Sequence, residues 1–316
     1  MPEATTPKRV FVAINPTASF GKGSRVGPAV LKALTDAGHD VTRLMEPSYA
    51  DLIVAAKKAV ASKPDALVVV GGDGMVNLGT NLVAGTDVPL GIVPSGTGND
   101  MARSLGIPNE DTDAAIRTLL AQLQLPPRTI DAGLIHRSDG GQTWFACMVS
   151  AGFDAVVNER ANRMTWPKGR IRYNIALLYE LVGLKPITYT FDMDGVKSTT
   201  QAVMVSVGNG VSLGGGMLVT PDALVDDGLL DVLVVEKLGR VAFLRIFPRV
   251  FKGEHLSDPR VNVHKVKRVS IAAPDVAAYG DGERVGALPV EIEVVVGALK
   301  VLSPLSPLSP VSHAKP

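Results

Sequence analysis

The most chemically suggestive feature of this sequence is a turn of three glycines and one acid, Gly71-Gly72-Asp73-Gly74, with Asn77 shortly after it. The turn directly follows Ala66–Val70, an apolar run that predicts a buried strand. Strand ends in an open α/β sheet face the ligand crevice, and a following helix offers N–H groups to phosphate. We therefore predict a phosphate site at which Asp73 contacts a metal-bound phosphate rather than supporting the fold. A plain tight turn is the alternative.

A second loop of small and polar residues follows the next predicted strand, Pro89–Val93. It runs Pro94-Ser95-Gly96-Thr97-Gly98-Asn99-Asp100, so it offers glycines, the hydroxyl of Thr97, and the side chains of Asn99 and Asp100. One such loop would be a weak signal. Two of them at the ends of neighbouring strands predict a composite nucleotide site.

A third loop, residues 15–24, begins with Asn15 and Pro16 and follows the predicted strand Arg9–Asn15. It contains Gly21-Lys22, but a P-loop needs a further glycine five residues before Gly21, where this chain has Pro16. A dinucleotide-binding fingerprint is incomplete as well. Its third glycine is replaced by Asn77 after the first glycine pair and by Met101 after the second. A dehydrogenase that uses NAD therefore lacks its motif.

Composition narrows the functional classes further. The chain has 316 residues and a formal net charge of +1, which does not favour a nucleic-acid partner. Its single cysteine, Cys147, cannot form an internal disulfide, and no apolar run approaches the ~18 residues of a membrane span. We expect a cytoplasmic protein that contacts at most the inner face of a membrane, as a peripheral protein.

The first part of the chain predicts a doubly wound α/β domain over residues 9–127. Four short β-rich runs, the last of them Pro89–Val93, alternate with helical patterns such as Tyr49–Ala61. A further helix, Asp111–Leu123, leads to Pro126-Pro127, where we place the domain boundary.

Period-two segments dominate residues 128–302 and predict a mainly antiparallel β-sandwich domain. We expect two helices within it, Arg170–Leu184 and Arg240–Phe247, and a hairpin turn at Met193-Asp194-Gly195. Residues 303–316 are rich in serine and proline and predict a disordered tail. We expect the active site in the cleft between the two domains.

Taken together and in order, the motifs resemble one family, that of the diacylglycerol kinases, sphingosine kinases and bacterial soluble lipid kinases. The resemblance spans roughly residues 10–300. It rests on Asn15-Pro16, GGDG with Asn77, SGTGND at 95–100, SVGNG at 206–210, GGG at 214–216, PDA at 221–223, DDGLLD at 226–231 and YGDGE at 279–283. One departure is Met75, where the family usually has Thr or Ser after GGDG.

The resemblance implies an ATP- and Mg²⁺-dependent kinase and assigns residues to each role. ATP would be bound by Asn15, Pro16, Gly71, Gly72, Asp73, Gly74, Asn77, Thr97, Asn99 and Asp100. Asp73 would act near the triphosphate and its Mg²⁺, and Asp100 and Asp131 would join a water-linked network around that metal.

A second Mg²⁺ would be held by the side chain of Asp227 and the main-chain oxygens of Leu224 and Leu229, although Asp226-Asp227-Gly228 could also be a simple turn. Asp281 would be the general base with Glu283 beside it, and Glu283 itself remains an alternative base. Asp281-Gly282 could equally be a hairpin turn.

The acceptor is less visible in the sequence than the nucleotide site. Two basic and aromatic segments, residues 160–172 and 240–252, could meet the headgroups of a membrane, or could simply be solvated faces beside a core. We expect a lipid acceptor at the membrane surface, diacylglycerol or a relative. A kinase of a sphingoid lipid or of NAD, and a catalytically silent binding protein, are the alternatives. A homodimer is left open.

Overall fold

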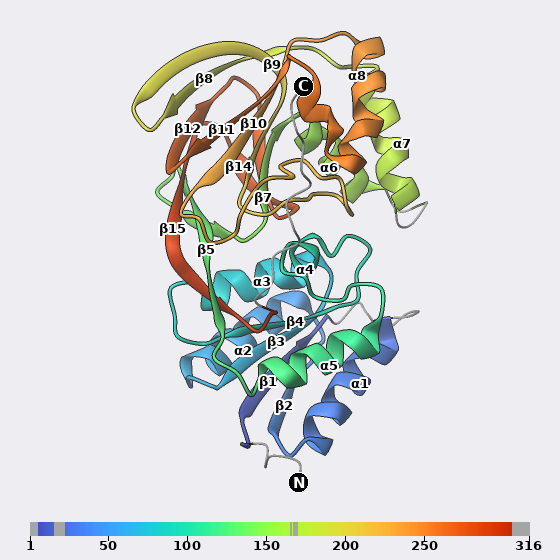
Figure 1. Cartoon of the computed structure of the whole chain (residues 1–316), viewed down its shortest axis with the longest axis vertical. Coiled ribbons are helices and arrows are strands. Elements are labelled where there is room, and N and C mark those ends of the chain that lie inside the picture. Colours follow the sequence, from blue (N-terminus) through green and yellow to red (C-terminus); the bar gives the residue numbers. More distant parts are fainter. Residues whose placement is uncertain (1–5, 16–22, 165, 167–169, 305–316) are drawn as a thin grey trace. The chain divides into compact units, whose positions relative to one another are not determined.

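The computed structural model describes residues 6–15, 23–164, 166 and 170–304 of the chain. These residues form two compact units (Figure 1). Unit 1 contains the chain up to Ile130 and takes it up again at Gly297, and unit 2 contains Asp131–Val296. Strands β5 (Arg128–Arg137) and β15 (Val290–Val301) carry the chain from one unit to the other.

Unit 1 is built on a parallel sheet in the order β2-β1-β3-β4. Its strands are β1 (Arg9–Ile14), β2 (Asp40–Leu44), β3 (Ala66–Gly71) and β4 (Leu90–Pro94). All residues of β3 and β4 are buried, as expected for central strands that helices cover on both faces. The doubly wound α/β fold predicted from the sequence is confirmed.

The helices of unit 1 follow the strands in alternation. They are α1 (Gly23–Asp36), α2 (Tyr49–Ala61), α3 (Asp73–Val83), α4 (Asp100–Ser104) and α5 (Thr112–Gln122). Helix α1 packs against α5, and α2 packs against α3. The end of β15 completes this unit, because Val301 pairs with Leu90 in parallel and Leu302 N–H donates to the oxygen of Leu90 (2.9 Å).

Unit 2 is mainly antiparallel, which confirms the predicted sandwich domain. Besides β5 and β15 its strands are β6 (Gln142–Phe145), β7 (Met148–Gly152), β8 (Ile187–Met193), β9 (Val196–Gly208), β10 (Leu230–Glu236), β11 (Val261–Val266), β12 (Arg268–Ala272), β13 (Ala277–Gly280) and β14 (Glu283–Ala287). The long strand β9 pairs with β7, β8 and β10. The predicted hairpin turn is present: Asp194 and Gly195 join β8 to β9, both with positive φ.

Two apolar clusters form the interior of unit 2. One contains Phe145, Tyr189 and Phe191 and lies among the strands. The other lies between strands and a helical layer, which is made of α6 (Phe153–Arg163), α7 (Arg170–Leu181), α8 (Arg240–Ile246) and the 3₁₀ segments η2 (Phe247–Lys252) and η3 (Glu254–Ser257). The sequence had indicated two helices here, so α6 is an addition.

Candidate active site

The three predicted loops of unit 1 begin side by side. Ile14 pairs with Val70, and Gly71 pairs with Pro94, so β1, β3 and β4 end at the same edge of the sheet. Asn15 N–H approaches the oxygen of Val70 at 3.4 Å. Parallel pairing therefore brings together the beginnings of the three loops for which the sequence predicts nucleotide contacts. Pro16, one of the predicted contacts, lies outside the described residues.

The glycines that follow strands β3 and β4 pack against one another. A Cβ atom on Gly96 would lie 2.4 Å from the Cα of Gly72, and one on Gly98 would lie 2.2 Å from Oδ2 of Asp73. Both distances are far shorter than any normal contact, so these positions accept only glycine without a shift of backbone or side chain. The glycines therefore hold the two loops in contact, a role in addition to the phosphate approach expected from the sequence.

Asp73 joins the two loops through hydrogen bonds. Its Oδ2 accepts the N–H of Asn99 (3.0 Å) and its Oδ1 accepts the N–H of Asp100 (2.7 Å), at the beginning of α4. The expectation that Asp73 is not a fold residue was wrong. Its carboxylate caps the first turn of α4, a task that a sequence pattern cannot show because the two segments lie far apart in the chain.

Asn99 and Asp100 are also engaged inside the loop. Asn99 has a positive φ of 55°, and its side chain bonds both to the N–H of Gly96 (3.1 Å) and to the oxygen of Gly96 (3.0 Å). Asp100 is buried and pairs with Arg103 (2.9 Å). Both residues thus shape the loop, and Arg103 neutralises the buried charge of Asp100.

Two other predicted contacts differ in exposure. Thr97 is exposed on the loop, so its hydroxyl faces solvent. Asn77 is buried on α3, and within the described residues its Nδ2 has no hydrogen-bond partner. Helix α3 begins after Gly72 without a side-chain cap, so its first N–H groups and its positive end can bind phosphate. This arrangement fits the nucleotide predicted from the sequence.

Asp281 occupies the turn between β13 and β14 in unit 2. Its φ is 47° and that of Gly282 is 86°, so the hairpin-turn interpretation is correct for the backbone. The carboxylate accepts three backbone N–H groups, from Ala146 (2.8 Å), Cys147 (3.0 Å) and Met148 (2.9 Å). Asp281 is buried, and this set of donors holds its carboxylate in one orientation.

Glu283 contrasts with Asp281, although the two lie only two residues apart. Its side chain is exposed at the start of β14. The neighbouring Tyr279 is buried, and burial, followed by the negative charge of Glu159, raises the pKa of its hydroxyl. The two candidate bases therefore differ in their surroundings. Asp281 has a buried carboxylate held in one orientation, and Glu283 has an exposed one.

Asp131 and Asp227 meet at one turn of unit 2. Asp131 is buried, and its Oδ2 accepts the N–H of Gly228 (2.7 Å). The side chain of Asn209, from the motif SVGNG, donates through Nδ2 to the main-chain oxygens of Asp131 (3.1 Å) and Ala146 (2.9 Å). Asp100 belongs to unit 1, so the acidic network that would join it to Asp131 stays a prediction.

The donor set around Asp227 does not fit the predicted second Mg²⁺. Oδ1 of Asp227 accepts the N–H of Leu229 (3.1 Å), and Oδ2 pairs with Nζ of Lys265 (2.9 Å). Each carboxylate oxygen therefore already accepts one hydrogen bond from the protein, and the donor at Oδ2 is a cation, which opposes a second cation at the same oxygen. Within the described residues, no group of three or more His, Cys, Asp or Glu side chains could hold a metal ion.

Lys265 bridges two carboxylates, because its Nζ also lies 3.4 Å from Oδ2 of Asp231. Burial raises the pKa of Asp231 to about 6, against the opposing pull of Lys265. Partial burial alone would lower the pKa of Lys265, but the two carboxylates more than offset this and raise it. Lys265 could not be predicted as a partner of these acids, because it lies on β11, far from the acidic motif in the sequence.

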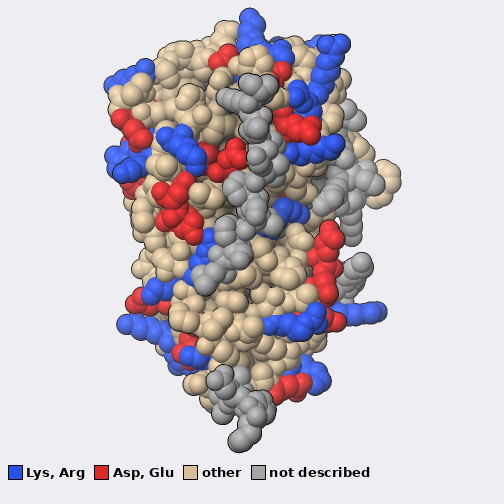
Figure 2. All heavy atoms as spheres, viewed as in Figure 1, with Lys and Arg blue, Asp and Glu red and all other residues tan. Residues whose placement is uncertain are grey.

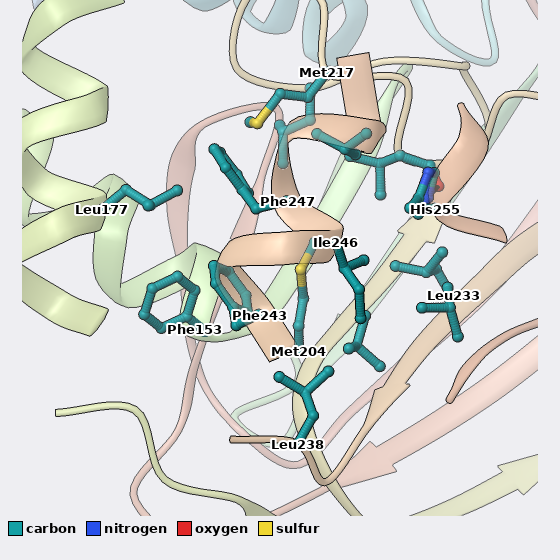
Figure 3. A pocket seen from close by; sticks show the side chains of 15 residues that line it. Phe153, Leu177, Met204, Met217, Leu233, Leu238, Phe243, Ile246, Phe247 and His255 are labelled. Carbon is teal, nitrogen blue, oxygen red and sulfur yellow. Dashed lines mark hydrogen bonds between the residues drawn. The ribbon is translucent and has the colours of Figure 1, made fainter. Parts of the chain in front are cut away.

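An apolar pocket lies beneath the helical layer of unit 2. It encloses about 610 Å³ of empty space, part of it open to solvent. Figure 3 shows Phe153 of α6, Phe243 of α8 and Met204 of β9 turned toward this space. Its other lining residues are also apolar, with His255 the exception, and His255 bonds through Nε2 to the oxygen of Val219 (3.0 Å). The pocket was not predicted, since its walls come from many segments that are far apart in the sequence.

The sequence is similar to known proteins along nearly all of its length, so the similarity includes both units. Over 297 residues the chain is 38% identical to a diacylglycerol kinase of Mycobacterium tuberculosis, and the alignment covers 94% of this chain and 95% of that protein. The chain belongs to the diacylglycerol kinase family. The resemblance inferred from the motifs is confirmed, and so is the expectation of an enzyme.

Domain matches and other relatives agree with membership in the diacylglycerol kinase family. Residues 9–133 match the diacylglycerol kinase catalytic domain, and residues 147–303 match the YegS C-terminal NAD kinase beta sandwich-like domain. A diacylglycerol kinase of Bacillus subtilis is 27% identical over 300 residues, which cover 94% of this chain and 97% of the relative.

Solved structures show that the fold is shared more widely than the family. A crystal structure of a diacylglycerol kinase from Bacillus anthracis matches with a TM-score of 0.73 at 24% identity, covering 95% of this chain and 99% of that one. An NAD kinase from Archaeoglobus fulgidus in complex with ATP matches with a TM-score of 0.50 at 12% identity, covering 93% and 92%. At these identities the likeness concerns the fold alone.

Proposed function

We propose that this diacylglycerol kinase family member transfers the terminal phosphoryl group of ATP to the free hydroxyl of diacylglycerol, with Mg²⁺, so that phosphatidic acid forms. The apolar pocket of unit 2 is the observation that carries the choice of acceptor. The rival acceptor NAD is polar throughout and would need hydrogen-bonding side chains, whereas His255 is the one polar residue among those that line this pocket. An acyl chain matches such a lining.

The pocket as described is narrow. Only about 50 Å³ of its space can hold the centre of a water molecule, so neighbouring side chains must part to admit a chain. The side chains best placed to do so are the aromatic rings of the helical layer: Phe243 packs edge-on against Phe153 (4.9 Å between centroids) and is stacked on Phe247 (5.7 Å). Together they close the pocket on the helical side.

The chemistry divides between the two units. In unit 1 the loops that begin at Asn15, Gly71 and Pro94 would bind ATP, with the beginning of α3 and the Thr97 hydroxyl on the phosphates. Mg²⁺ would supply charge neutralisation as the phosphoryl group is transferred. In unit 2, Asp281 would accept the proton of the lipid hydroxyl, its orientation held by the N–H groups of residues 146–148.

The acceptor is tested by filling the pocket. Met204 is partly buried and lines the pocket, so Met204→Trp adds bulk to the pocket wall. With mixed micelles of long-chain and short-chain diacylglycerols as substrates, we expect this variant to raise KM for the long-chain lipid at least tenfold. The KM for the short-chain lipid should change less, and the KM for ATP should stay the same.

The matched control is Val54→Trp, which adds the same bulk on an exposed face of α2 in unit 1 and should behave like the parent. The proposal fails if NAD or sphingosine is phosphorylated faster than diacylglycerol. It also fails in its structural basis if Met204→Trp treats all chain lengths alike.

We further propose that the helical layer of unit 2 contacts the membrane that contains the lipid. Its outer surface exposes Tyr179, Val182, Val241, Leu244 and Phe251, although these are large apolar side chains. Arg245 and Lys252 are exposed on the same layer. Apolar side chains with flanking cations are the features that favour the interface of an anionic membrane. No helix among the described residues is long and apolar enough to cross a membrane.

Some residues expected at this basic rim have partners within the protein instead. Arg160 pairs with Glu180 and lies over the ring of Tyr179 at 3.9 Å. Arg163 pairs with Glu159, and Arg240 donates to the oxygen of Val182. Lys168 lies outside the described residues. Arg245 and Lys252 of the second segment, residues 240–252, therefore support membrane contact better than Arg160 and Arg163 of the first.

A further inference from the structure

The turn that contains Asp227 concentrates negative charge in unit 2. Asp227 follows Asp226, Asp222 lies nearby in the chain, and Asp231 is the second residue of β10. The side chain of Asp231 is 2% exposed, and the charges of Asp227 and Asp222 both act on it. Buried and half-buried carboxylates in one place require a cation, or they destabilise the fold.

The pairing of β10 with β11 places such a cation, Lys265, beside Asp231. Lys265 of β11 lies directly opposite Asp231 of β10 in the antiparallel register, so their side chains emerge on the same face of the sheet. From there the ammonium group reaches Oδ2 of Asp227 at 2.9 Å and Oδ2 of Asp231 at 3.4 Å. The position of Lys265 is thus determined by the register of two strands rather than by a flexible loop.

The remaining oxygen of Asp227 is also used. Its Oδ1 accepts the N–H of Leu229 (3.1 Å), which closes the turn on itself, and the N–H of Gly228 donates to Asp131 (2.7 Å). A divalent ion at Asp227 would lie close to the ammonium group of Lys265, which is 2.9 Å from Oδ2, and the two positive charges would repel each other. Mg²⁺ requires oxygen ligands, and the only predicted side-chain ligand of this site, Asp227, is already paired with a lysine nitrogen.

We infer that the ammonium group of Lys265 is the permanent cation of this turn and takes the place of the Mg²⁺ that the family resemblance implies at Asp227, Leu224 and Leu229. The turn is stabilised without a metal, so this part of the fold does not depend on divalent ions. The inference is independent of the proposed function, since it concerns stability in the absence of any substrate.

The test is thermal unfolding of the full chain without nucleotide, in millimolar MgCl₂ and in EDTA at matched ionic strength. We expect the parent protein to unfold at the same temperature in both. Lys265→Met removes the charge while keeping an unbranched side chain, and it should lower Tm by several degrees, because two carboxylates lose their cation. In this variant MgCl₂ should restore part of the loss.

Two further variants complete the design. Lys265→Arg keeps the charge and should stay near the parent in both solutions. Lys300→Met, the matched control, removes the lysine that pairs with Asp87 in unit 1, and it should gain no response to Mg²⁺ because Asp87 is a single exposed carboxylate.

Either of two results would overturn the inference. One is a saturable rise in the Tm of the parent protein with MgCl₂ that Asp227→Asn abolishes. The other is a Lys265→Met protein with the Tm of the parent.

Discussion

Asp73 combines a proposed contact with the nucleotide and a structural task, so its removal should affect two measurements. In Asp73→Ala the N–H groups of Asn99 and Asp100 lose their acceptor. A hydrogen bond to a charged group contributes about 1.5–3 kcal/mol, and we expect a loss of about 2 kcal/mol in the free energy of unfolding, together with loss of kinase activity. Urea denaturation and an activity assay measure the two effects.

Asp113→Ala is the control for this prediction, because Asp113 is also an acid in the first turn of a helix, α5. It should leave activity unchanged. An Asp73→Ala protein as stable as the parent would mean that the hydrogen bonds to α4 contribute little to stability.

Asp281 and Glu283 can be distinguished by a pair of isosteric changes. Asp281→Asn removes the basic carboxylate and places an amide NH₂ among N–H donors, so both kcat and Tm should fall, kcat by about 10²-fold or more. Glu283→Gln changes an exposed side chain and should leave Tm unaltered, with kcat within a few-fold of the parent. If instead Glu283→Gln is inactive while folded Asp281→Asn still turns over, the base is Glu283.

His39 gives unit 1 a dependence on pH. It is buried, its Nδ1 accepts the N–H of Lys8 (3.2 Å), and burial, followed by the charge of Lys8, lowers its pKa. Below pH ~6.5 the unfolded chain takes up a proton that the folded chain does not, so stability falls as the pH is lowered through this range. We expect His39→Gln to flatten the decline in Tm between neutral and mildly acidic pH, and the exposed His264→Gln not to.

The residue types of the site could be predicted from the sequence better than their partners could. Asp73 and Asp100 were singled out because they lie in polar, glycine-containing loops after apolar runs, and Asp131, Asp227 and Asp281 were singled out by the family resemblance of their motifs. What Asp73 and Asp281 bond to could not be seen, since the N–H donors come from segments more than 20 and more than 130 residues away. Lys265 was missed for the same reason.

At the scale of elements, the two glycine-containing loops of unit 1 are in contact, and we expect this contact to shape the proposed nucleotide site. Gly96→Ala would force its Cβ against the Cα of Gly72, which is backbone and can move only with its whole loop. A displacement of about 1 Å in a catalytic site can lower the rate by about 10²-fold, and we expect a loss of that order in kcat/KM for ATP.

Gly239→Ala provides the comparison. Gly239 precedes α8 with a φ of −84°, and no atom lies within 4 Å of a Cβ placed there. That variant should retain activity. Full activity in Gly96→Ala would show that the loops can separate without harm.

The bounds of helices with a clear periodicity of apolar residues were predicted closely. Elements that depend on tertiary contacts were not predicted. The predicted Tyr49–Ala61 matches α2, and the helix expected at Asp111–Leu123 is α5, with Asp111 as its N-cap. Helix α6 was missed because its mean hydropathy is low and its apolar residues follow a glycine at the end of β7. The short strands β6 and β14 carry too few residues to show an alternating pattern.

At the scale of the whole molecule, charge is balanced. Figure 2 shows Lys and Arg side chains interspersed with Asp and Glu on the face in view, as the net charge of +1 suggests. Attraction to a membrane must then come from a local set of cations. We expect vesicle binding to increase with anionic lipid and to weaken with salt.

Charge reversal tests this local set. The double variant Arg245→Glu with Arg249→Glu should raise KM for diacylglycerol in anionic vesicles several-fold and leave KM for ATP unchanged. The control pair Lys32→Glu with Arg117→Glu reverses two exposed cations of unit 1 and should have no such effect. Equal binding of the parent to neutral and anionic vesicles would remove the proposed membrane contact.

The return of β15 to unit 1 has a consequence for synthesis on the ribosome. Unit 1 emerges first, but Leu90 receives its last partners, Val301 and Leu302, only after residues 131–296 have been made. At roughly 5–20 residues per second, the nascent unit waits roughly 10–30 s with one edge of its parallel sheet uncovered. Translation speed through unit 2 therefore sets how long that edge is exposed to chaperones and to neighbouring nascent chains, and a stop codon anywhere before Val301 damages the first domain as well as the second.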